Sequence, residues 1–375
     1  MTKSGYLQPA IQAYGGGIWH TWFDRDLGLA GRVIIRNPET KKLEYKLVHC
    51  KEALLKIPNL AIHFTRKDSF EFNKEQQLRP FLATQEIDNL ETHHNLETPQ
   101  LAATLDMQIR EFPAIIQKIA SEIKVNPGDI VDFDLNLIDV QPASFMGIYK
   151  EFISSQNIDN QISCHCGLEA FKDIHENSDF VKNDKDINIL VMFDHEEIGS
   201  KSMQGALSTY LATVSKRIFQ RATVDCPDTE EFYNAALRRS FIFSADLAHA
   251  INPNYASYHQ EVHPVHFHKG VVIKTNHSMS YATDSVSSVI FKEIAEKVSV
   301  PVQEFVVKCD SLCGTTVGPL LNTNTSIKAI DIGIGQLAMH SIRETCATTD
   351  VYYYYKLMKG FYEVFNKVDT TLLGM

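Results

Sequence analysis

The second part of the chain, from about residue 141 onward, alternates between two hydrophobic patterns. Short continuous apolar runs predict buried strands at 187–193, 241–245, 270–275 and 328–333. Longer segments with apolar residues at helical spacing predict helices at 160–174, 200–220, 229–240, 284–298 and 351–367. Strands that alternate with helices are typical of an α/β layered fold with helices on both faces of the sheet.

The first part of the chain has a different pattern. Short β-like runs at 32–36 and 44–49 are separated by the turn residues Asn37-Pro38, and residues 130–139 alternate strictly between apolar and polar. A half-buried strand shows this alternation because successive side chains point to opposite faces of a sheet. We therefore expect strands in this part rather than the alternation of strands and helices.

A chain of 375 residues with 44% hydrophobic content can form either one large core or two domains. The change of pattern favours two domains. We expect a smaller β-rich domain over 1–140 and an α/β domain over 141–375. A polar stretch at 85–100 predicts a mobile connection within the first domain.

Charge and hydropathy exclude some classes of function. The formal net charge of −10 argues against non-specific binding to nucleic acid or to anionic membranes. No run of 18 apolar residues is present, so no membrane span is predicted. The first residues lack the apolar core of a secretory signal.

The seven cysteines show no regular framework, which is typical of a reduced, cytoplasmic protein. Cys164-His165-Cys166 lies inside a predicted helix, where residues two apart do not share a face. A zinc site there is therefore disfavoured.

The pair Glu196-Glu197 directly follows the apolar run 187–193. On an extended segment, neighbouring side chains point to opposite sides, so one carboxylate could bind a metal while the other reaches a water. The alternative is a pair of glutamates at a solvated helix start, where the helix dipole favours negative charge. The pair alone does not decide between these interpretations.

Other segments supply more metal-binding side chains. Asp159 opens a predicted helix, where it could cap the N-terminus or bind a cation. Asp246 follows a short predicted strand, with His249 three residues later, and His340 lies in an apolar setting, where a lone histidine is usually a satisfied core residue. Carboxylates and imidazoles in combination are typical of zinc sites. Two such ions can generate hydroxide near neutral pH, and a free glutamate then serves as proton shuttle.

The order Asp159, Glu196-Glu197, Asp246, His340 resembles that of the aspartyl aminopeptidases, which are cytosolic zinc exopeptidases with two co-catalytic ions. The resemblance extends over essentially the whole chain. Its further motifs are Tyr14-Gly-Gly-Gly-Ile-Trp19, Thr21-Trp-Phe-Asp-Arg-Asp26, Leu60-Ala-Ile-His63, Ser244-Ala-Asp246, Asn252-Pro-Asn-Tyr255, His268-Lys-Gly270, Ile273-Lys274, Tyr281-Ala282, Cys313-Gly-Thr-Thr316 and Leu337-Ala-Met-His-Ser-Ile-Arg343.

The resemblance implies a role for each residue of this order. Asp159 would bridge two zinc ions, Glu197 and His340 would complete one of them, and Asp246 would help to hold the other. Glu196 would be the general base. The implied fold is a three-layer α/β/α metallopeptidase catalytic domain, truncated at its N-terminal side, plus a smaller β-rich oligomerisation domain.

The resemblance also implies a homo-oligomer, a large assembly built from dimers through the smaller domain. His63 would reach the active site of a neighbouring subunit and stabilise the oxyanion there. Lys274, with His249 and Tyr281, would grip the acidic side chain of the substrate. The alternatives are a hydrogen-bonded core histidine at His63 and a charge on an edge strand at Lys274.

One departure from the family pattern concerns the first metal ligand. In the family this ligand is the histidine of a His-Thr-Asp motif upstream of the Gly5-Tyr6 segment, and no His-x-Asp occurs in this chain. We therefore expect a chain that begins after that motif, with Asp159 and Asp246 alone at the second, impaired zinc site and with exposed strand edges.

The sequence favours a metallo-aminopeptidase that releases N-terminal Asp or Glu from peptides. The alternatives are an inactive truncated form or pseudo-enzyme that acts as an assembly partner, and a co-catalytic zinc aminopeptidase of other specificity.

Overall fold

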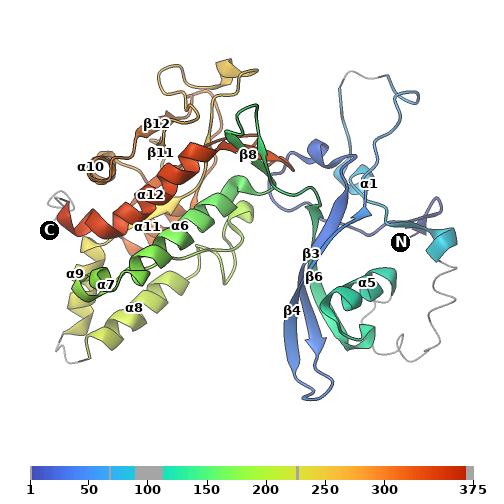
Figure 1. Ribbon diagram of the computed structural model, residues 1–375, viewed down its shortest axis with the longest axis horizontal. Coiled ribbons are helices and arrows are strands. Elements are labelled where there is room, and N and C mark those ends of the chain that lie inside the picture. Colours follow the sequence, from blue (N-terminus) through green and yellow to red (C-terminus); the bar gives the residue numbers. More distant parts are fainter. Residues whose placement is uncertain (1, 67–68, 89–112, 225–227, 369–375) are drawn as a thin grey trace. The chain divides into compact units, whose positions relative to one another are not determined.

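The computed structural model describes residues 2–66, 69–88, 113–224 and 228–368 (Figure 1). Its contacts divide the chain into two units. Met1–Ala13 and Gly17–Pro142 form unit 1, and Tyr14–Gly16 and Ala143–Met375 form unit 2. The hydrophobic pattern of the sequence changes near residue 140, close to the boundary between the units at Pro142 and Ala143. Residues 89–100 of the polar stretch lie outside the described residues.

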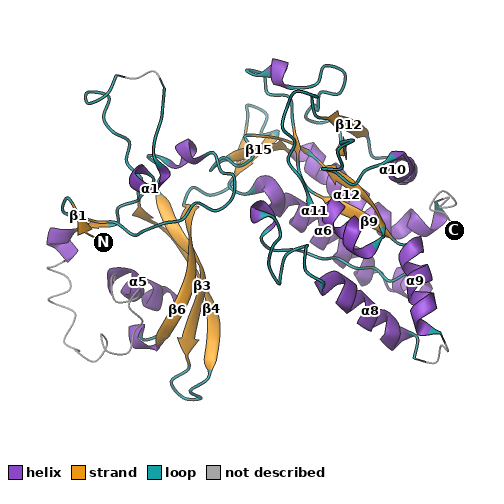
Figure 2. Ribbon diagram, turned by 180° about the vertical axis from the view of Figure 1, so that it is seen from behind, coloured by secondary structure: helices purple, strands orange, loops and turns teal. Residues whose placement is uncertain are grey.

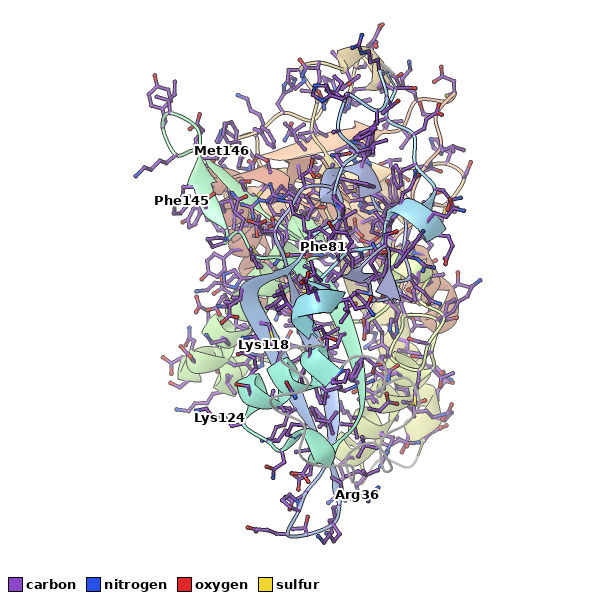
Figure 3. The ribbon with its side chains drawn as sticks, turned by 90° about the vertical axis from the view of Figure 1, so that its right-hand side faces the viewer. Arg36, Phe81, Lys118, Lys124, Phe145 and Met146 are labelled. Atoms are coloured by element: carbon purple, nitrogen blue, oxygen red, sulfur yellow. The ribbon has the colours of Figure 1, made fainter. Side chains whose placement is uncertain are left out.

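Unit 1 is built on an antiparallel sheet in the order β4-β3-β6. Its strands are β3 (Leu27–Arg36), β4 (Leu43–Leu55) and β6 (Ile130–Asp139). Helix α5 (Pro113–Ile123) packs on β4 and buries Ile116 and Ile119. Lys118 on α5 pairs with Glu52 on β4 at 2.7 Å and so ties the helix to the strand (Figure 3).

The predicted strand at 130–139 is confirmed, and β3 and β4 extend the predicted runs. The smaller elements of unit 1 are β1 (Thr2–Lys3), β2 (Tyr6–Leu7), η1 (Trp19–Trp22), α1 (Lys74–Gln77), β5 (Ala83–Thr84) and η2 (Pro127–Asp129).

Unit 2 has an α/β fold around a mixed sheet in the order β12-β11-β13-β9 (Figure 2). Adjacent pairs β11–β12 and β13–β9 are parallel, and β11–β13 is antiparallel. The strands are β9 (Phe241–Ala245), β11 (Val271–Thr275), β12 (Val302–Val306) and β13 (Lys328–Gly333). Three of these confirm predicted strands.

Helices enclose this sheet. Helices α10 and α12 pack on it, α6 lies beside α12, and α11 packs on β9 and β13 (Figures 1 and 2). Their apolar faces and the strands form one core that includes Ile273, Phe291, Ile330 and Tyr354. The bounds are α6 (Ile158–Glu176), α10 (Ser285–Lys297), α11 (Val317–Thr325) and α12 (Thr348–Val364).

A second sheet of unit 2 has the order β10-β14-β15-β8-β7. It consists of β7 (Ser144–Met146), β8 (Phe152–Ser155), β10 (Ala248–His249), β14 (Gly335–Leu337) and β15 (Glu344–Ala347). Phe145 and Met146 on the edge strand β7 are exposed (Figure 3). Strand β10 itself contains His249, and the segment that follows β14 carries His340, so both histidines of the predicted site belong to this sheet and its loops.

The remaining elements of unit 2 are α7 (Ser178–Asn183), η3 (Glu196–Ile198), α8 (Tyr210–Ala222), α9 (Thr229–Arg239), η4 (Ala256–Tyr258) and η5 (Phe365–Lys367). Helix α8 begins ten residues later than predicted, because the chain folds back on itself at Gly205. A Cβ at Gly205 would lie 2.2 Å from the carbonyl oxygen of Ser200. None of the described helices is both long and apolar enough to cross a bilayer.

The predicted strand at 187–193 is wrong. No strand is assigned there among the described residues, and Ile187 and Met192 are 51% and 49% exposed. An apolar run becomes a strand only where a neighbouring strand takes up its backbone hydrogen bonds. The described part of the chain supplies no such neighbour to this segment.

Candidate metal centre

Three of the predicted metal ligands come together in unit 2. One ligand atom each of Asp159, Glu197 and His340 lies within 4.8 Å of the other two. His340 Nε2 is 3.1 Å from Glu197 Oε2 and 3.8 Å from Asp159 Oδ2. Two carboxylates and one imidazole at this separation match the donor set of a zinc site.

Asp159 reaches this cluster because the first turn of α6 is irregular. Its backbone has φ −81° and ψ 111°, which is not helical, and the preceding Asn157 is left-handed at φ 51°. Asp159 therefore does not cap the helix, since Asn157 occupies the N-cap position. The Asp159 side chain is only 5% exposed.

Glu196 and Glu197 lie on the short 3₁₀ helix η3 and not at the end of a strand. Left-handed residues, His195 at φ 62° and Gly199 at φ 92°, flank η3 on both sides. Gly15 packs closely against this turn, because a Cβ there would lie 3.0 Å from the Glu197 carbonyl oxygen. The glycine-rich motif near the N-terminus thus packs directly against the backbone of Glu197.

His340 follows β14 in a left-handed conformation at φ 67°. Its side chain is 35% exposed, so the interpretation as a core histidine is wrong. The ring Nδ1 lies 3.3 Å from the Gly16 carbonyl oxygen, while Nε2 faces the two carboxylates. The hydrogen bond with Glu197 raises the pKa of His340 to about 9.

Electrostatic repulsion concentrates at this cluster. Burial, followed by the charges of Asp246 and Glu197, raises the pKa of Asp159 to about 8 and that of Glu196 to about 7. Carboxylates that repel one another in a partly buried site favour the binding of a cation, which compensates their charge. The residues present therefore fit a divalent metal ion.

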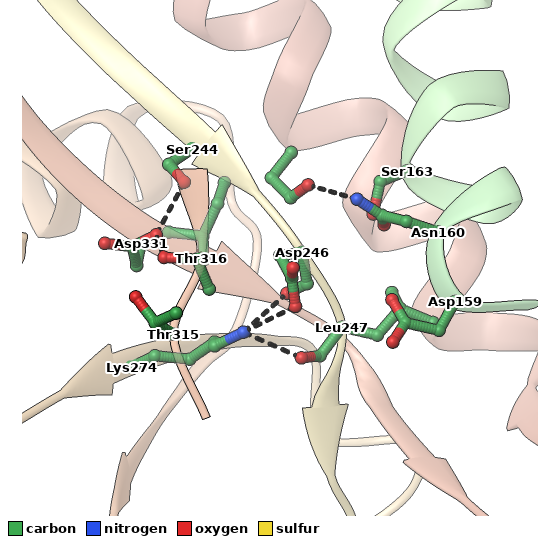
Figure 4. A network of polar contacts seen from close by, with 12 residues as sticks. Asp159, Asn160, Ser163, Ser244, Asp246, Leu247, Lys274, Thr315, Thr316 and Asp331 are labelled. Atoms are coloured by element: carbon green, nitrogen blue, oxygen red, sulfur yellow. Dashed lines mark hydrogen bonds and ion pairs between the residues drawn. The ribbon is translucent and has the colours of Figure 1, made fainter. Parts of the chain in front are cut away.

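Asp246 and Lys274 form an ion pair beside the cluster (Figure 4). Lys274 Nζ donates to Asp246 Oδ1 and to the Leu247 carbonyl oxygen, both at 2.8 Å. The lysine is 2% exposed and lies on β11, an inner strand, so the interpretation as an edge-strand charge is wrong. Its ammonium also lies 4.9 Å from the centre of the Tyr281 ring.

The predicted substrate residues surround this ion pair. Tyr281 is 4% exposed, and burial raises the pKa of its hydroxyl. His249 is an exposed residue, yet desolvation of its ring by the surrounding protein and the Lys274 charge lower its pKa to about 4. A cleft of about 350 Å³ adjoins it, lined by His249, Asn252, Tyr255, Tyr258, His259 and Gln336, among others.

Other predicted positions lie elsewhere. His63 belongs to unit 1 and is exposed, as are Leu60 and Ile62, so the interpretation as a core histidine is wrong. Cys164-His165-Cys166 lies within α6, where the Cys166 thiol is buried and donates to the Val351 carbonyl oxygen.

Glu344 and Asp331 are two of the buried carboxylates that the sequence did not predict. Glu344, which is 2% exposed, accepts hydrogen bonds from the backbone N–H groups of Asp159 and His340. Asp331 is fully buried and accepts from Ser244 and Thr316 (Figure 4). A lone acid inside an apolar strand is the signal that could have identified Asp331.

The family model of the aminopeptidase I zinc metalloproteases (M18) matches residues 1–362. The chain belongs to this family. Its enzyme class is therefore that of the zinc metallopeptidases, and the α/β fold agrees with that of solved M18 structures.

Named relatives support the assignment. A "Probable aspartyl aminopeptidase" of Ricinus communis is 41% identical, over 99% of this chain and 78% of that protein. The "Aspartyl aminopeptidase" of Caenorhabditis elegans is 40% identical, over 99% of this chain and 76% of that protein. A solved structure, described as "Cryo-EM structure of the Ape4 and Nbr1 complex", superposes with a TM-score of 0.89 at 36% identity and covers 98% of this chain and 68% of that one.

Proposed function

We propose that this protein is a metallo-aminopeptidase that removes an N-terminal Asp or Glu from peptides. The observation that carries the proposal is the cluster of Asp159, Glu197 and His340, with the free carboxylate of Glu196 on the same turn as Glu197. Relatives named aspartyl aminopeptidases support the substrate class.

In this proposal Asp159, Glu197 and His340 would hold one zinc ion. Asp159 and Asp246 would contribute to a second. When bound, zinc polarises the scissile carbonyl and lowers the pKa of a water molecule. Glu196 takes a proton from the attacking water and delivers it to the leaving amine. A carboxylate with a pKa near neutrality is suited to both transfers.

Lys274 is the proposed partner of the acidic substrate side chain. Its ammonium is buried and is held by Asp246, a residue that we also assign to the second ion. If Asp246 were to bind the second ion, the Lys274 ammonium would lose its ion-pair partner, and a substrate carboxylate could take that place. A neutral side chain there would leave a buried charge unpaired, which is strongly unfavourable.

Assembly and location form part of the same proposal. Unit 1 pairs subunits into a homo-oligomer built from dimers, and His63 then serves the active site of a neighbouring subunit. The exposed position of His63 supports this, because a side chain on the surface is free to contact another subunit. On sequence grounds we place the protein in the cytoplasm.

One observation favours the alternative of an inactive assembly partner. Asp246 is engaged by Lys274, so a second ion would have to compete with that ion pair. Zinc stoichiometry and turnover measured on the same preparation separate the two functions.

The test measures kcat/KM on peptides that begin with Asp, Glu, Ala or Leu, before and after removal of metal and with zinc restored. We expect zinc-dependent hydrolysis that is fastest on the acidic peptides.

Lys274→Met should lower the ratio of acidic to neutral kcat/KM at least about tenfold, since it removes the charge and keeps the apolar stem. The control is Lys292→Met, because Lys292 is a half-exposed lysine that pairs with Glu304 on the surface. An unchanged ratio in Lys274→Met would contradict the assigned specificity, and zinc-independent turnover would contradict the metal mechanism.

A further inference from the structure

Glu344 joins the backbones of two residues of the candidate metal centre. Its Oε1 accepts from the N–H of His340 at 2.7 Å, and its Oε2 accepts from the N–H of Asp159 at 2.9 Å. The carboxylate is 2% exposed, at the first position of β15. Glu344 lies 185 residues after Asp159 and 4 residues after His340. One buried side chain thus holds two loops that are far apart in the sequence.

Both loops need such support, because neither has a regular backbone. His340 is left-handed at φ 67°, and the residue two before Asp159, Asn157, is left-handed at φ 51°. Residues other than glycine adopt this conformation at a cost, and they keep it only where surrounding contacts hold them. Backbone hydrogen bonds to a carboxylate are among the stronger ones that a folded protein forms.

We propose that Glu344 is a positioning residue that sets the separation of the Asp159 and His340 side chains and thereby the affinity of the metal centre. The two side chains approach to 3.8 Å, and both must stay near this distance to bind one ion. The proposal rests on the proposed function, in which these residues bind zinc. Groups that orient metal ligands typically change metal affinity about 10- to 100-fold when they are removed.

Glu344→Gln keeps the size of the side chain but removes the carboxylate charge and one of its two acceptor oxygens. Glutamine keeps the volume and one acceptor oxygen, but its NH₂ group faces one of the two backbone N–H donors. One ligand loop therefore loses its anchor while the other keeps it. Glu344→Asp keeps both acceptor oxygens on a stem that is one methylene shorter, so it should retain part of the function.

Asp350 offers a matched control. It is fully buried and also accepts from two backbone N–H groups, those of His268 and Gly270, both at 2.8 Å. Neither of these two residues belongs to the candidate centre. Asp350→Asn therefore creates the same kind of defect in the fold without a direct link to Asp159 or His340.

The experiment compares the wild-type 375-residue chain with Glu344→Gln, Glu344→Asp and Asp350→Asn. Each protein is freed of metal, its unfolding by urea is measured, and it is then titrated with Co²⁺ by visible absorption and with Zn²⁺ by competition. We expect Glu344→Gln and Asp350→Asn to lose similar stability without metal. Affinity should fall about 10- to 100-fold in Glu344→Gln, with an altered Co²⁺ spectrum, and by less in Glu344→Asp, while Asp350→Asn stays within about threefold of wild type.

Wild-type affinity and spectrum in a folded Glu344→Gln would overturn the positioning role and leave the proposed function standing. If Glu344→Gln does not fold, Glu344→Asp decides, and wild-type affinity in that variant overturns the role. If Asp350→Asn lost as much metal affinity as Glu344→Gln, general destabilisation of the fold would explain both losses. That result would also overturn the positioning role of Glu344. A wild-type chain that binds neither ion would contradict the proposed function and this role together.

Discussion

At the scale of single residues, adjacent carboxylates of this protein occupy different environments. Glu197 makes a hydrogen bond with His340, whereas Glu196 is partly buried beside it and has a pKa raised to about 7. These different environments support the proposal that the two residues have different roles, in which Glu197 binds metal and Glu196 transfers protons.

The first prediction concerns Glu196→Gln. Glutamine keeps the shape of the side chain but cannot accept the proton, so kcat should fall by a factor on the order of 10²–10⁴. Zinc content, measured by elemental analysis, should stay at the wild-type level. Near-normal turnover in the zinc-loaded variant would disprove the role of Glu196 as base.

The second prediction concerns His249 and the dependence of stability on pH. Its pKa is lowered to about 4 in the folded protein, against an ordinary histidine value of 6.5. Between these values the unfolded chain binds a proton that the folded protein does not, so stability falls as pH falls from about 6.5 toward 4. His249→Asn should therefore lose less stability than wild type over this interval.

The measurement is the difference between the free energies of unfolding of the two proteins in urea at a series of pH values. The difference should be constant above about pH 7.5 and should shift in favour of the variant below about pH 6.5. A difference that does not change with pH would show that the folded protein does not disfavour the charged imidazole.

At the scale of elements, loops around the site are held by buried carboxylates. Asp331 on β13 accepts from the Ser244 hydroxyl on β9 and from the Thr316 hydroxyl at the start of α11. It also accepts from the Ala282 backbone N–H, next to Tyr281. One side chain thus links two strands, a helix and the loop that carries a predicted substrate residue.

The third prediction is that Asp331→Ala lowers the free energy of unfolding by about 3 kcal/mol or more, because several buried donors lose their acceptor at roughly 1–3 kcal/mol each. Urea unfolding measures this change. Asp134→Ala is the control, since Asp134 pairs with Arg32 on the surface and such pairs contribute only about 0–1 kcal/mol. Equal effects of the two substitutions would contradict the structural role of Asp331.

At the scale of the whole molecule, the chain divides into two compact units, and the predicted catalytic groups belong to both. Asp159, Glu196 and His340 belong to unit 2, whereas His63 belongs to unit 1. If His63 acts in a neighbouring subunit, as we propose, activity would depend on assembly.

The fourth prediction follows from that dependence. Subunits with His63→Ala and subunits with Glu196→Gln should each be inactive alone but should regain activity when they are co-expressed with different affinity tags and purified as mixed oligomers. Some sites then combine an intact His63 from one subunit with an intact Glu196 from the other. Verified mixed oligomers without activity would place His63 in the site of its own subunit or remove it from catalysis.

The class of this protein and much of its secondary structure follow from patterns along the chain. The strict alternation at 130–139, the strands 241–245 and 328–333 and the helices near 160–174 and 351–367 follow from local periodicity, because burial on one face constrains spacing along the chain. The order of acids and histidines sufficed to indicate the family to which the chain belongs.

The way in which these parts meet depends on contacts between distant segments. The apolar run 187–193 does not form a strand, because an apolar sequence cannot specify whether a partner strand is beside it. The Lys274 ion pair with Asp246 and the anchoring of Asp159 by Glu344 join residues 28 and 185 positions apart. Neither contact leaves a periodic signal, since each depends on which loops the fold brings together rather than on the spacing of residues along the chain.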